Sequence, residues 1–182
     1  EIAQCLVGSE MCIRDRICES DYFKRSSWTI GPYGKVLDIN ASCMVRVENR
    51  ELGGVQPFVC YSVSFGDSRM EVTVSLAPNS PTLRFSIKVL WREFGEENGA
   101  TPLLQFYVPF SFDADTYRYD IPCGSIDREA EGHDVPSIAY AAPVPCGQKC
   151  TLGLTTDCKY GYRGGENCLS VNLLHASYFP DP

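Results

Sequence analysis

The amino-acid sequence predicts an all-β chain, folded as an antiparallel β-sandwich. Apolar and polar residues alternate with a period of two in several segments, which is typical of strands with one buried face. These segments are rich in Val, Ile, Phe, Tyr and Thr, whose side chains suit a pleated surface. Clusters of Gly, Pro, Asn, Asp and Ser separate them at short intervals and indicate turns. No segment has the apolar spacing of a three-turn amphipathic helix.

The expected strands follow one another along the chain. In the first half they occupy residues 44–48, 58–65, 71–76 and 83–91. In the second half they occupy residues 104–110, 116–122, 151–156 and 168–174. Prolines fall at strand ends or mark edges, because proline cannot donate a hydrogen bond to a ladder. Residues 124–134 are expected to form a long polar loop, a type of segment that is often functional or covers an interface.

Length and composition indicate one folded domain, or one lobe of a larger protein. The chain has 182 residues, of which 44% are hydrophobic, so it can bury a core. Its 16 Lys and Arg residues and 23 Asp and Glu residues give a net charge of −7. Because the chain lacks a basic run that would attract phosphates, we expect neither nucleic acid nor membrane as a partner. No apolar run approaches the roughly 20 residues that a membrane-spanning helix needs.

The N-terminal segment differs from the rest of the chain. Residues 5–16 resemble the translation of a sequencing adapter. We therefore predict that residues 1–16 are not native protein and that residues 17–182 form the folded section. We also expect the sequence to be an internal piece of a longer chain.

Metal-ligating residues are few or badly spaced. The chain has only two histidines, His133 and His175. A zinc site could be drawn from four of its ten cysteines, Cys146, Cys150, Cys158 and Cys168. Structural zinc sites favour two closely spaced cysteine pairs, and only one such pair exists here, so we expect no metal in this chain. The cysteines are either disulfide-bonded or small buried side chains, and the sequence leaves both alternatives open.

No catalytic constellation stands out. Carboxylates are plentiful between residues 113 and 157, but an acidic loop is usually a solvated face rather than a hydrolase pair. Neither Ser125 nor Ser137 lies in a Gly-x-Ser-x-Gly elbow, which argues against a serine triad. We therefore expect no catalytic residue here. Residues 40–42 form an N-glycosylation sequon, which matters only in a secreted protein.

One segment has the composition of a sugar-binding rim. Tyr160 and Tyr162 flank Gly161, and Asp157 and Lys159 lie beside them. Aromatic faces stack on the apolar faces of sugars, and charged groups form hydrogen bonds with hydroxyls. The alternative is a tyrosine-bearing hairpin turn in which Gly161 adopts a positive φ. The residues alone favour the hairpin turn.

Several motifs occur in an order that resembles one enzyme family. Residues 157–165, 169–174 and 180–182 resemble the Asp-x-Lys-Tyr-Gly-Tyr, Leu-x-Leu-x-Leu-Leu-Arg-Ser-Pro and Pro-Asp-Pro stretches of glycoside hydrolase family 38 α-mannosidases of the bacterial and cytosolic type. Upstream matches follow the family order at residues 28–31, 83–93, 106–117, 121–128 and 132–136. Together these motifs extend over about residues 22–182. The sequence departs from the family at residues 175–177, where His-Ala-Ser replaces Arg-Ser-Pro, and at Leu90, which replaces an Asp.

The resemblance implies a role within a larger enzyme. The chain would form part of the galactose-mutarotase-like β-sandwich region of a retaining exo-α-mannosidase that takes part in glycan hydrolysis and mannose metabolism. In that family the zinc ion, its His and Asp ligands and the Asp nucleophile belong to a catalytic barrel, which is missing here. We therefore expect this fragment to be inactive alone. A stand-alone carbohydrate-binding β-sandwich module is the alternative.

The resemblance also implies partners and candidate contact residues. The expected partners are the catalytic barrel of the same parent chain and α-mannoside glycans, while zinc is expected in the missing domain. By position in the family, four residues are expected to pack on the barrel or line its substrate rim: Asp157, Lys159, Tyr160 and Tyr162. The compartment is left open, with the cytoplasm favoured over secretion or a vacuolar or lysosomal location.

Overall fold

The computed structural model describes residues 14–20, 32–39, 43–95, 101–130, 132–144, 152–165 and 167–178, with only the backbone for 14–20. The regular elements in these residues are all β-strands, and every strand pairing is antiparallel. The predicted all-β fold is therefore confirmed. The chain divides into two compact units: unit 1 combines Glu1–Asp38 with Phe94–Pro182, and unit 2 is Ile39–Glu93. No helix that could span a bilayer occurs in the described part of the chain.

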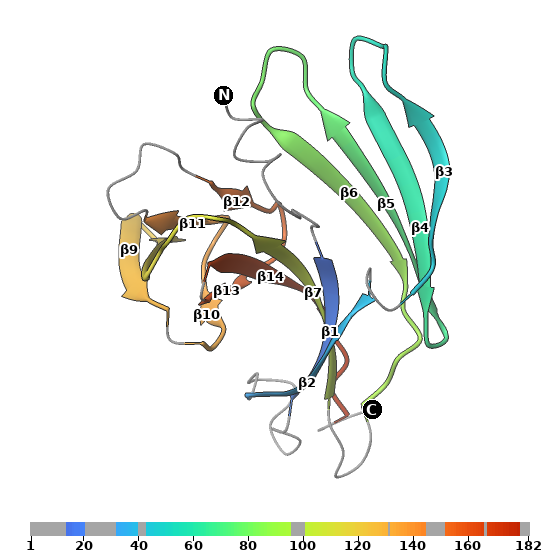
Figure 1. Cartoon of the computed structure of the whole chain (residues 1–182). Coiled ribbons are helices and arrows are strands. Elements are labelled where there is room, and N and C mark those ends of the chain that lie inside the picture. Colours follow the sequence, from blue (N-terminus) through green and yellow to red (C-terminus); the bar gives the residue numbers. More distant parts are fainter. Residues whose placement is uncertain are drawn as a thin grey trace. The chain divides into compact units, whose positions relative to one another are not determined.

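Unit 2 is a four-stranded meander (Figure 1). Its strands are β3 (Val45–Glu51), β4 (Phe58–Phe65), β5 (Ser68–Leu76) and β6 (Leu83–Leu90). One face carries Val63, Met70 and Val72, which are almost fully buried. On the opposite face, Glu48 accepts a hydrogen bond from Ser62 at 2.6 Å. This division into an apolar and a polar face follows from the period-two pattern of the sequence.

The Trp91–Glu93 motif fixes the turn between β4 and β5. Only Gly66 and Asp67 separate the paired residues at the ends of these strands, and Gly66 has a φ of +51°. The Glu93 carboxylate accepts hydrogen bonds from the Asp67 N–H at 3.0 Å and from the Ser68 hydroxyl at 2.8 Å. The Trp91 ring lies 6.2 Å from that of Phe65. These contacts give the motif a structural role within unit 2.

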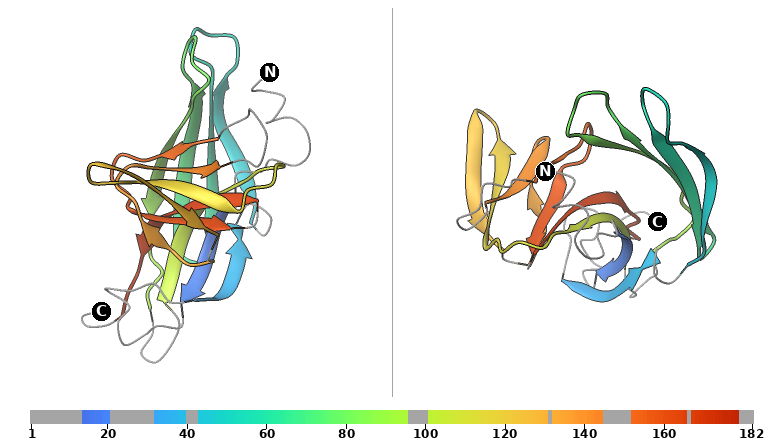
Figure 2. Two further views of the ribbon diagram at one scale, coloured as in Figure 1. Left: turned by 90° about the vertical axis from the view of Figure 1, so that its left-hand side faces the viewer. Right: turned by 45° about the horizontal axis from the view of Figure 1, so that its top comes forward.

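Unit 1 contains a six-stranded sheet in the order β10-β13-β14-β7-β1-β2, whose strands are labelled in Figure 1 and seen from two other sides in Figure 2. Its strands are β1 (Arg14–Ser20), β2 (Tyr33–Asp38), β7 (Thr101–Pro109), β10 (Val135–Pro136), β13 (Gly161–Gly165) and β14 (Cys168–His175). The centre of the sheet therefore joins β7 to β14, which are far apart in the sequence. β1 begins inside the segment 1–16 that was predicted to be non-native; that assignment remains a prediction.

The second sheet of unit 1 has the order β12-β11-β8-β9. Its strands are β8 (Thr116–Ile121), β9 (Gly124–Glu129), β11 (Tyr140–Val144) and β12 (Leu154–Thr155). Asp120 holds the connection into β11, because its carboxylate accepts hydrogen bonds from the Ser137 hydroxyl and from the N–H groups of residues 138–140. Burial acts to raise the pKa of Asp120, but these hydrogen bonds outweigh it and lower the pKa to about 2.

Three buried tyrosines connect the two sheets of unit 1. The Tyr117 hydroxyl donates to the Gly165 carbonyl, and the Tyr119 hydroxyl accepts from the Gly164 N–H at 3.0 Å. From the other sheet, the Tyr162 hydroxyl donates to the Ala139 carbonyl at 2.7 Å. A Cβ atom at Gly164 would lie 2.3 Å from the Tyr117 ring, so the close approach of the sheets requires glycine there.

Two local predictions were wrong. Residues 124–129 were expected in a loop but form the edge strand β9, which follows a two-residue turn with Cys123 at a φ of +69°. Residues 161–165 were expected to form a glycine-rich turn, and Gly161 a positive φ, but they form β13. The reason is that Gly164 is needed to accommodate the Tyr117 ring rather than to reverse the chain. The strand expected at 151–156 is shorter, since β12 covers only Leu154–Thr155.

Candidate functional site

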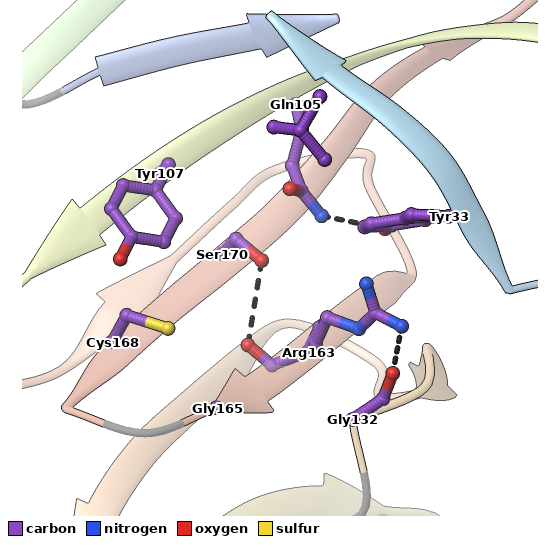
Figure 3. Close-up of a pocket in the computed structure, with 9 residues that line it drawn as sticks. Tyr33, Gln105, Tyr107, Gly132, Arg163, Gly165, Cys168 and Ser170 are labelled. Atoms are coloured by element: carbon purple, nitrogen blue, oxygen red, sulfur yellow. Dashed lines mark hydrogen bonds between the residues drawn. The ribbon is translucent and has the colours of Figure 1, made fainter. Parts of the chain in front are cut away.

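The six-stranded sheet has a polar face, opposite the tyrosine core. The register pairs Arg163 with Ser170, Ser170 with Tyr107, and Asn172 with Gln105. Because paired residues point to the same side of a sheet and alternate along each strand, these five side chains share one face. Figure 3 shows four of them, from β7, β13 and β14, directed toward the same space. The sheet thus brings together polar groups from distant parts of the chain.

A hydrogen-bond network extends across this face. The Gln105 amide donates to the Tyr33 hydroxyl at 2.7 Å and to the Asn172 carbonyl oxygen at 3.2 Å. The Tyr33 hydroxyl in turn donates to the Asp134 carboxylate at 2.9 Å. Tyr33 lies on the edge strand β2, while Asp134 immediately precedes the opposite edge strand β10. The sheet must therefore curve so that its two edges approach each other on the polar face.

Arg163 is held by two contacts. Its guanidinium lies over the Tyr33 ring, 3.7 Å from the centroid, and donates a hydrogen bond to the Gly132 carbonyl. A cation above an aromatic face is attracted by the negative ring quadrupole. The Nε atom of Arg163 is buried and has no hydrogen-bond partner among the described residues, and the same holds for His175 Nε2. Buried polar atoms are normally paired, so this face carries unused hydrogen-bonding capacity.

Burial shifts the pKa values of Asp134 and His175. It raises the pKa of Asp134, although the Arg163 charge and the Tyr33 hydrogen bond partly offset this effect. It lowers the pKa of His175, although the nearby Asp134 charge partly offsets this effect. Burial therefore favours the neutral form of both groups, which is the usual consequence of removing a charge from water.

A cavity of about 300 Å³ opens beside this network. It is lined by residues from β2, β7, β13 and β14 and from the segment before β10, namely Tyr33, Val36, Gln105, Tyr107, Gly132, Arg163, Gly165, Cys168 and Ser170. Its walls combine two aromatic rings with a few polar groups (Figure 3). That combination and volume match the lower end of small-molecule sites, about 300–1,000 Å³.

The four predicted rim residues have different environments. Asp157 is exposed, Lys159 is half-buried, and the Tyr160 side chain is 60% exposed. Tyr162 is fully buried, so in this structure it belongs to the core between the sheets. Whether the first three contact a barrel or a substrate remains a prediction.

The residues of the polar face were not identified as site residues from the sequence. Arg163 could have been recognised, because it follows Tyr162 in an alternating strand and must point to the opposite face. Tyr33 and Asp134 gave no such signal, since 101 positions separate them. Their association depends on the strand order of the folded sheet.

The cysteines and the sequon noted in the sequence lie partly within the described residues and partly outside them. Cys146 and Cys150, two of the conceivable zinc ligands, and the sequon at 40–42 lie outside the described residues. Cys43, Cys60, Cys123 and Cys158 are free thiols. Within the described ranges, no three His, Cys, Asp or Glu side chains are grouped as metal ligands.

Comparison with known proteins identifies the family. Residues 16–182 match the glycosyl hydrolases family 38 C-terminal domain. No curated protein matches the chain. The match extends over most of the chain and agrees with the ordered motifs found in the sequence. The chain therefore belongs to glycosyl hydrolase family 38, of which it represents the C-terminal domain.

Proposed function

We propose that this chain is the β-domain of a retaining, zinc-dependent exo-α-mannosidase, and that it packs on a catalytic barrel of the same parent protein. The observation that carries the proposal is the family match over residues 16–182, which assigns the chain to the C-terminal domain of a glycoside hydrolase family.

In the parent enzyme, the barrel and the β-domain would have different roles. The barrel would hold the zinc ion and the carboxylate nucleophile, which together supply Lewis-acid binding of sugar hydroxyls and formation of the glycosyl-enzyme. This chain would supply a supporting surface, to which the exposed side chains of Asp157 and Tyr160 and the half-buried side chain of Lys159 are available. Alone, it is expected not to hydrolyse glycosides.

The test is recovery of the upstream coding sequence. It should encode a barrel with a His-x-Asp zinc motif and a nucleophilic Asp, and the extended protein should release nitrophenol from 4-nitrophenyl α-mannoside. Replacing the nucleophile by Asn should abolish this activity, while the 182-residue chain alone serves as the inactive control. An upstream domain of another type would refute the proposal.

The alternative is a stand-alone carbohydrate-binding module, which the exposed Tyr160 ring supports. The burial of Tyr162 weakens it, because only one of the two tyrosines of the expected rim remains available for stacking. Mannoside binding that is lost on Tyr160→Ala would favour this module. Unchanged binding in that variant would rule out a rim at Tyr160.

A further inference from the structure

We draw no further inference here: the strongest candidate, the pair of large exposed side chains Ile138 and Tyr160 on the adjoining connections that lead into β11 and β13, carries none because nothing in the structure shows what covers it.

Discussion

The close approach of the two sheets at Gly164 makes one substitution especially informative. In Gly164→Ala the new Cβ would lie 2.3, 2.4 and 2.8 Å from three atoms of the Tyr117 ring, so the ring or strand must move by about 1 Å to restore ordinary contact. The ring has little room, because its hydroxyl donates a hydrogen bond to the Gly165 carbonyl and the centroid of the tilted Phe110 ring lies 6.4 Å from its own. Overpacking of this kind costs about 1–3 kcal/mol, and we expect the upper end here.

Thermal unfolding of the full chain measures this effect. A loss of about 3 kcal/mol should lower the Tm by roughly 6–12 °C in a protein of this size. Gly153→Ala is the control, because nothing lies within 4 Å of its added Cβ; it should change stability by no more than about 0.5 kcal/mol. In a Tyr117→Leu background the added methyl should cost less, since the ring is gone. An equal cost in both backgrounds would refute the argument.

Three further predictions concern hydrogen bonds. Tyr162→Phe should lower the free energy of unfolding by about 0.5–1.5 kcal/mol, as measured by urea denaturation, because the hydrogen bond from the Tyr162 hydroxyl to the Ala139 carbonyl is lost while that carbonyl keeps the Thr156 N–H as a donor. The pKa of Asp120 is lowered from 3.8 to about 2, so its stabilisation is complete above pH 3.8 and is lost as the pH falls through 2; Asp120→Asn should flatten the acid-denaturation curve across that interval. Glu93→Ala should accelerate amide hydrogen exchange around residues 67–68, whereas unchanged exchange would show that the carboxylate does not hold that turn.

The sequence predicted unit 2 better than unit 1, for a physical reason. In β4 the residues Tyr61, Val63 and Phe65 face one side and the serines between them the other, so the alternation marked residues 58–65, the bounds found in the structure. β9 was missed because both of its faces are largely exposed and its sequence therefore shows no apolar period. Its turn residue Cys123 also adopts a positive φ without being Gly or Asn, so Pro122 was the only one of the two turn residues typical of a turn.

The candidate site was harder to predict than the strands. The composition of the sequence drew attention to the segment around Tyr160. Arg163 follows Tyr162 directly, but nothing in the sequence marked it as a site residue. What makes Arg163 notable is the ring of Tyr33 beneath its guanidinium, on a strand from the far edge of the same sheet. Such pairings arise from strand order, which local patterns do not encode.

The position of β14 has a consequence for how the protein is made. β14 lies in the middle of the six-stranded sheet, between β13 and β7, although it is the last strand that the structure describes. Every pairing in unit 2 instead joins strands that are neighbours in the sequence. All four strands of unit 2 are therefore available for pairing as soon as β6 has left the ribosome. Unit 1 must keep one edge of β7 unpaired until β14 emerges, and this interval of translation is when its strands can mispair.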